Sequence, residues 1–181
     1  MNLPNKLTMM RVVLVPVFMI FAAVSHYGTA DFHAVYMLIA GVIFAIASIT
    51  DFLDGYLARK NHLVTDFGKF MDPLADKMLV MAAMCYFVEY GQMPGWCLAI
   101  VLLREFAVSG MRLVAVEQGR VIAAAWSGKV KTASTMVCLC LMLVFQSNLL
   151  NVVCIAVIVA TTVYSGIEYF AKNLDVFKEA D

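Results

Sequence analysis

The chain has 181 residues, of which 63% are hydrophobic, and its 13 basic and 13 acidic residues cancel to a formal net charge of zero. A mean hydropathy of +0.86 excludes an ordinary soluble domain of this length and indicates an all-α integral membrane protein. No nucleic-acid partner is expected.

Six apolar stretches are predicted to be spanning helices, each of which needs roughly 20 residues. In chain order they centre near Val17, Ile43, Met81, Val101, Leu139 and Ile158. The segment before the first stretch is expected to form a short interfacial helix. No internal repeat or linker divides the chain, so residues 1–181 are predicted to form a single membrane domain.

Basic residues separate the predicted loops into two sets. Loops 26–32, 89–95 and 146–151 contain no Lys or Arg, whereas the N-terminal segment, loops 59–69 and 117–131 and the C-terminal tail are rich in them. Because Lys and Arg are retained on the cytoplasmic side, both termini are predicted to face the cytoplasm.

Aspartates gather where the second and third stretches approach that side. Residues 32–59 are helix-compatible over about 40 Å, which exceeds a hydrocarbon core of roughly 30 Å, so the end of this helix should emerge among the headgroups. Spacings of three, four and seven residues put side chains on one helical face. Four carboxylates are thus predicted to face one another across a helical hairpin: Asp51, Asp54, Asp72 and Asp76. Residues with small or no side chains share these faces: Gly55, Ala58 and Gly68.

The four carboxylates need a positive partner. At about 5 Å and an effective dielectric near 20, each pair repels by on the order of 3 kcal/mol. Salt bridges to Arg59, Lys69 and Lys77 are one solution, but Lys77 directly follows Asp76 and so points to a different face. Divalent metal is the better solution. Oxygen ligands without His or Cys indicate Mg²⁺, Mn²⁺ or Ca²⁺, and four aspartates can bridge two ions.

The pattern Asp51-x2-Asp54-Gly55-x2-Ala58-Arg59-x8-Gly68-x3-Asp72-x3-Asp76 resembles the complete signature of the CDP-alcohol phosphotransferases. The resemblance implies a six-helix membrane enzyme, generally homodimeric, that displaces CMP from a CDP-linked alcohol with Mg²⁺ or Mn²⁺, here expected as two ions. It further implies that Asp51, Asp54 and Asp72 hold metal and that Asp76 shares the second ion or acts as the catalytic base.

Two further stretches narrow the resemblance. "NLPNKLTMMR" (residues 2–11) and "LREFAVSGMRLVAVEQGRVIAAAWSGKVKT" (residues 103–132) resemble the bacterial branch of the family that joins CDP-diacylglycerol to glycerol 3-phosphate. The resemblance implies phosphatidyl transfer to glycerol 3-phosphate, with release of CMP, at the cytoplasmic face of the bacterial inner membrane. Acyl chains could then remain in the surrounding membrane lipid during the reaction.

The CDP-diacylglycerol nucleotide needs its own pocket. Gly55, Ala58 and Gly68 would permit close backbone approach, and Arg59 could contact the phosphates. Thr65 could donate to a phosphate or cap the third helix. The base could be reached by Asn5 and Thr8, for which simple helix capping is the alternative.

The acceptor phosphate needs cations. Arg104 lies deep in the fourth stretch, where an arginine costs roughly 2.5–3.5 kcal/mol, so it must face a polar cavity or a partner. We predict that Arg112 and Lys129 bind the acceptor phosphate, with Arg104 and Lys131 in support. Anchoring at the membrane surface is the alternative for Lys131. Because adjacent positions on a helix diverge, Glu105 is expected to neutralise an arginine of a neighbouring helix or subunit.

Three other interpretations stay open. Within the same family the acceptor could be inositol phosphate, serine or phosphatidylglycerol. A divalent-cation transporter would also place carboxylates among apolar helices. Transport sites, however, tend to lie near the bilayer midplane in chains built from two repeated halves, whereas these aspartates form one cluster near one face of the membrane. A purely structural assembly protein gives no reason for the small residues beside the acids.

Overall fold

The computed structural model describes residues 3–27, 30–60, 66–120, 122–123 and 125–177. Within these ranges, side chains are described except at 3–5, 7, 30–33, 51–60, 66–70, 72–73, 76 and 177.

The described ranges contain six α-helices, a short 3₁₀ helix and no strand. The elements are α1 (Leu3–Tyr27), α2 (Ala30–Lys60), α3 (Asp66–Glu89), α4 (Gly95–Glu117), α5 (Trp126–Phe145), α6 (Asn148–Asn173) and η1 (Leu174–Phe177). The all-α prediction is confirmed, and each predicted stretch coincides with one helix. With 31 residues, α2 is about 46 Å long at 1.5 Å per residue.

Three described helical stretches are long and apolar enough to cross a membrane: Thr8–Tyr27, Trp126–Phe145 and Asn148–Val176. A shorter apolar stretch, Ala34–Thr50, lies within α2. Charged residues interrupt the apolar sequence of the other two helices, Lys77 in α3 and Arg104, Glu105 and Arg112 in α4. The structure therefore supports an integral membrane protein with at least these apolar spans.

The N-terminus differs from the expectation of a separate interfacial helix. The structure has one continuous helix from Leu3, so Asn5 and Thr8 lie in the first two turns of α1. Pro4 stands in the first turn, where a missing N–H costs nothing because that group has no intrahelical partner. Since no further Gly or Pro occurs before Pro16, nothing local breaks the helix.

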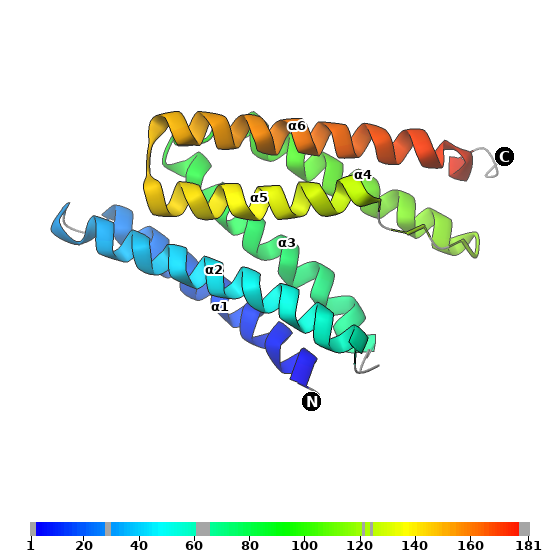
Figure 1. Cartoon of the computed structure of the whole chain (residues 1–181), viewed down its shortest axis with the longest axis horizontal. Coiled ribbons are helices and arrows are strands. Elements are labelled where there is room, and N and C mark those ends of the chain that lie inside the picture. The colour runs from blue at the N-terminus through cyan, green and yellow to red at the C-terminus, as the bar shows by residue number, and fades with distance from the viewer. Residues whose placement is uncertain (1–2, 28–29, 61–65, 121, 124, 178–181) are drawn as a thin grey trace.

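The helices pack as two groups, which meet where α2 packs directly against α5 and where α3 contacts α4 and α5. α1 packs along α2, α5 runs antiparallel to α6, and α3 contacts helices of both groups (Figure 1). Figure 1 shows the end of α2, the start of α3 and the end of α6 towards the right of the molecule, and the start of α1 at the bottom, at the right-hand end of that helix. We call this side, where α1, α3 and α5 begin and α2, α4 and α6 end, the basic end.

Two apolar clusters hold the bundle together. The larger one includes fully buried side chains from several helices, among them Phe18, Phe44, Phe87, Val101 and Leu139. The smaller one lies nearer the basic end and contains Val108, Met111 and Tyr169. Along α4, the charged residues Arg104 and Glu105 fall between the two clusters. The interior of the bundle is therefore polar between the two apolar clusters.

The outer surface is apolar. Leu103 and Phe106 of α4 are each 71% exposed, whereas Lys131 and Thr162 are buried. An exposed apolar surface over a partly polar interior is expected for a helix bundle in lipid, because polar groups there turn towards the bundle or a water-filled cavity.

Candidate functional site

The predicted acidic faces lie on helices whose backbone is described. Asp51 and Asp54 stand near the end of α2, and Asp72 and Asp76 near the start of α3. Because both helices are continuous through these positions, the three- and four-residue spacings put each pair on one helical face. Both helix ends belong to the basic end (Figure 1).

Most predicted metal and nucleotide residues have side chains outside the described set. These are Asn5, Asp51, Asp54, Gly55, Ala58, Arg59, Gly68, Asp72 and Asp76, and Thr65 lies outside with its backbone as well. In the part of the chain that is described, no group of three or more His, Cys, Asp or Glu residues could hold a metal ion. The roles of these residues stay predictions.

α1 brings two buried polar residues to the basic end. Thr8 is 1% exposed and Arg11, three residues later, is fully buried. Residues three apart share a helical face, so the predicted nucleotide residue Thr8 has a buried arginine beside it. α1 packs against both α2 and α3, the helices that carry the aspartates.

The central feature of the described site is a cationic cluster around one carboxylate. Lys131 Nζ donates to Glu105 Oε1 at 2.7 Å, and Arg104 Nη1 donates to the same oxygen at 2.9 Å. Lys77 Nζ lies 3.6 Å from Glu105 Oε2. The Lys131, Arg104 and Glu105 side chains are 5%, 13% and 13% exposed. With one carboxylate for three cations, the cluster keeps two positive charges, which suits a doubly charged phosphate group.

Arg104 occupies a slot between α5 and α6. Its Nη2 donates to Ser165 Oγ at 2.7 Å. A Cβ added at Gly128 would stand 3.4 Å from Arg104 Nη2, and one added at Gly166 would stand 3.4 Å from Arg104 Cγ. The arginine therefore lies close against both glycines, and the slot has no room for side chains larger than a methyl group.

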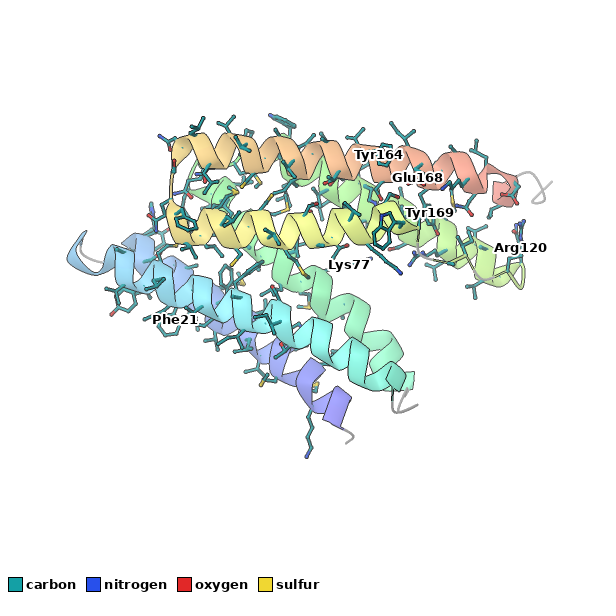
Figure 2. The ribbon with its side chains drawn as sticks, viewed as in Figure 1. Phe21, Lys77, Arg120, Tyr164, Glu168 and Tyr169 are labelled. Carbon is teal, nitrogen blue, oxygen red and sulfur yellow. The ribbon has the colours of Figure 1, made fainter. Side chains whose placement is uncertain are left out.

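Arg112 lies nearer the basic end than the cluster. Its Nε donates to the hydroxyl of Tyr169 at 3.0 Å, and its guanidinium carbon lies 5.5 Å from the centre of that ring. Tyr169 itself is buried at 2% exposure. Figure 2 shows Tyr169 on the part of α6 close to the C-terminus. The tyrosine holds the arginine against α6 through both a hydrogen bond and a cation–π contact.

Lys129 is not brought to this cluster. Two residues on a helix differ by about 200° in direction, so Lys129 and Lys131 point to different sides of α5, and Lys129 is exposed while Lys131 is buried. Among the described residues, the side chain of Lys129 has no hydrogen-bond or ion-pair partner. Its role in acceptor binding stays a prediction.

The expectation for Glu105 was wrong in one respect. Its arginine partner is the adjacent Arg104 of the same helix, joined by lysines from α3 and α5. Adjacent Cβ atoms do diverge, but the long arginine side chain turns back towards its neighbour inside the slot left by Gly128 and Gly166.

Five residues of this site were not identified from the sequence. Ser109, Ser165 and Tyr169 hold cations, and Gly128 and Gly166 lie against one. The glycines carried a usable signal, because a glycine inside a helix costs roughly 1 kcal/mol relative to alanine and so indicates a need for space. The serines carried none, since a lone serine is common in membrane helices.

Fold and site together define a polytopic α-helical membrane protein with a buried cationic cluster between its helices. The chain belongs to the CDP-alcohol phosphatidyltransferase family, whose sequence model matches residues 1–164.

Curated relatives cover nearly the whole chain. It is 42% identical to the CDP-diacylglycerol--glycerol-3-phosphate 3-phosphatidyltransferase of Bacillus subtilis, over 99% of both proteins. It is 39% identical to a probable phosphatidylglycerophosphate synthase of Mycobacterium tuberculosis, over 96% of this chain and 82% of that protein. A Haemophilus influenzae protein with the same name as the Bacillus relative is 38% identical over 93% of this chain and 91% of its own length.

Proposed function

We propose that this protein transfers the phosphatidyl group of CDP-diacylglycerol to glycerol 3-phosphate, giving phosphatidylglycerophosphate and CMP. The observation that carries the proposal is the similarity over 99% of both chains to a relative named for that reaction. The same name recurs for relatives from other bacteria at about the same identity. A cluster that retains two positive charges fits an acceptor that brings a phosphate.

The part of the site that binds the donor, CDP-diacylglycerol, is proposed to hold divalent metal, on which the family generally depends. Asp51, Asp54, Asp72 and Asp76 would be the ligands, because four carboxylates without His or Cys form a hard oxygen donor set that fits Mg²⁺ or Mn²⁺. Two such ions would neutralise charge on the pyrophosphate oxygens of the donor. The nucleotide would be bound by Asn5, Thr8, Gly55, Ala58, Arg59, Thr65 and Gly68.

Asp76 is proposed as the base. Its carboxylate would take the proton from the attacking hydroxyl of the acceptor. The oxygen of that hydroxyl would then form a bond to the β-phosphorus of CDP-diacylglycerol. The bond between this phosphorus and the bridging oxygen would break, and CMP would leave with the electron pair.

The acceptor phosphate is proposed to bind at the cationic end of the site. Arg112 is exposed and is oriented by Tyr169, so its free N–H groups can reach a phosphate that arrives from the basic end. Lys129 would add a second exposed charge. Arg104 and Lys131 are largely buried at Glu105, and this favours a supporting role behind the phosphate.

All six helices are proposed to span the cytoplasmic membrane of a bacterium, with the basic end on the cytoplasmic side and two copies forming a homodimer. The orientation rests on the charge of the loops. At the opposite end, the described loop residues 90–94 and 146–147 contain no Lys or Arg. The donor can then enter sideways from the bilayer, while glycerol 3-phosphate and CMP exchange with the cytoplasm.

The test is an acceptor panel with the purified protein in detergent micelles. CDP-diacylglycerol and Mg²⁺ would be supplied with glycerol 3-phosphate, inositol phosphate, serine or phosphatidylglycerol, and CMP release would be followed. We expect release with glycerol 3-phosphate and background release with the others, with phosphatidylglycerophosphate as the lipid product. Preferential CMP release with another acceptor would agree with the chemistry of the family but would contradict glycerol 3-phosphate as the acceptor.

A further inference from the structure

Lys77 stands apart from the other two cations at Glu105. Its side chain is 37% exposed, against 5% for Lys131 and 13% for Arg104. Figure 2 shows Lys77 where α3 passes α5. It is therefore the member of the cationic cluster with the best access for a ligand from outside the cluster.

Two groups of α4 hold the Lys77 ammonium in place. Ser109 Oγ accepts a hydrogen bond from Lys77 Nζ at 2.7 Å, and Glu105 Oε2 lies 3.6 Å away. Ser109 and Glu105 are four residues apart and so share one face of α4. An ammonium group has three donors, and these two contacts leave it able to donate to a further acceptor.

The charge at this point favours an anion. Glu105 already accepts hydrogen bonds from Lys131 and Arg104, so its single negative charge is shared among three cations. The small cavity that Lys77, Glu105 and Lys131 line with Thr132 and Thr135 has a volume of about 20 Å³, enough for one water molecule and too small for a phosphate. A phosphate would have to meet the cluster on its exposed side, where Lys77 lies.

Lys77 is also the residue that directly follows Asp76. Neighbouring positions on a helix lie about 1.5 Å apart along its axis, so residues 76 and 77 stand at almost the same height of α3. Glycerol 3-phosphate carries its phosphate and its far hydroxyl at the two ends of a three-carbon chain. If Asp76 is the base, as proposed above, an acceptor whose phosphate binds Lys77 would have its attacking hydroxyl on the same level of α3.

We propose that Lys77 is a phosphate-binding residue of the acceptor site, held in place by Ser109 and Glu105. The inference rests on the proposed function and adds a residue from α3 to acceptor binding. In this arrangement the ion pair with Glu105 orients the Lys77 ammonium before the acceptor binds. The hydrogen bond to Ser109 fixes the position of the ammonium along the axis of α4.

The experiment compares Lys77→Gln, Lys77→Arg and Ser109→Ala with the control Lys172→Gln. Lys172 is a matched control because it also pairs with a glutamate, Glu168, but on the outer surface of α6. Steady-state CMP release would give separate KM values for glycerol 3-phosphate and for CDP-diacylglycerol, and thermal unfolding in detergent would report folding.

For Lys77→Gln we expect KM for glycerol 3-phosphate to rise about tenfold or more, the loss typical of a charge-assisted hydrogen bond, with KM for CDP-diacylglycerol within about twofold. Lys77→Arg should bring KM for glycerol 3-phosphate part of the way back to that of the unmodified protein. Ser109→Ala should raise the same KM by a smaller factor. Lys172→Gln should leave both KM values unchanged.

Equal changes in both KM values, or a lower unfolding temperature with an unchanged KM for glycerol 3-phosphate, would overturn the proposal and make Lys77 a tether between α3 and α4. Failure of the unmodified protein to use glycerol 3-phosphate would instead contradict the proposed function, so the two failures can be told apart.

Discussion

Lys131 of α5 donates a 2.7 Å hydrogen bond to Glu105 of α4, and the side chains are 5% and 13% exposed. The contact joins two helices between the two apolar clusters of the bundle. A charge at such a position is retained only with partners, because leaving one unpaired in a dry interior is costly. The pair therefore has consequences for stability as well as for the acceptor site.

Replacing Lys131 with methionine should destabilise the protein without leaving Glu105 alone, since Arg104 still donates to it. We expect a loss of about 2 kcal/mol, typical of one hydrogen bond to a charged group, measured by thermal unfolding in detergent. Lys172→Met removes an exposed ion pair and should leave the unfolding temperature unchanged. Equal stability of the two variants would show that the buried contact contributes no more than the surface one.

Filling the arginine slot should displace Arg104. A Cβ at Gly166 already meets Arg104 Cγ at 3.4 Å, so the branched side chain of Gly166→Val has no room. We expect about 1–3 kcal/mol of destabilisation from overpacking and a higher KM for glycerol 3-phosphate. Gly110→Ala in α4 is the control, because a Cβ there meets nothing within 4 Å. The control variant should unfold with the same free energy as the unmodified protein, or with one up to about 1 kcal/mol higher, because alanine has a higher helix propensity than glycine.

Arg112→Ala should raise KM for glycerol 3-phosphate far more than KM for CDP-diacylglycerol, by about ten- to a hundredfold if a charge-assisted bond to the phosphate is lost. Tyr169→Phe removes only the hydroxyl that accepts from Arg112 Nε. It should produce a smaller change in the same direction, because the ring still packs under the guanidinium. Parallel increases in both KM values for Arg112→Ala would remove this residue from acceptor binding.

Asp76→Asn should abolish CMP release while keeping much of the nucleotide binding, because the amide cannot take the proton of the acceptor hydroxyl. Binding of a CDP-diacylglycerol analogue by calorimetry would separate the two effects. Full turnover by this variant would exclude Asp76 as the base.

The helices were predictable because their signal is local. Apolar stretches predicted all six, the helix-compatible residues 32–59 match α2 closely, and the candidate cap residue Thr65 comes directly before the start of α3. The separate N-terminal helix was expected from the polar residues before the first span. Helix continuity depends on backbone breakers instead, and residues 5–15 contain none, so α1 runs through.

The partners of the buried charges were less predictable. That Arg104 needed a polar partner followed from its depth in the span, but Ser165 lies 61 residues away on α6, and no helical spacing connects the two. The pairing of Glu105 with Lys131 and Lys77 likewise depends on how α3, α4 and α5 pack. The glycines at 128 and 166 carried the one local sign that something large fills the space beside them.

The most direct test of the proposed chemistry is the metal dependence of CMP release from CDP-diacylglycerol and glycerol 3-phosphate by the purified protein. With EDTA in excess we expect no release, full recovery with Mg²⁺ or Mn²⁺, and no recovery for a variant that combines Asp51→Asn with Asp72→Asn. Undiminished release in EDTA, or a metal response unchanged in that variant, would contradict a metal site formed by the aspartates of α2 and α3.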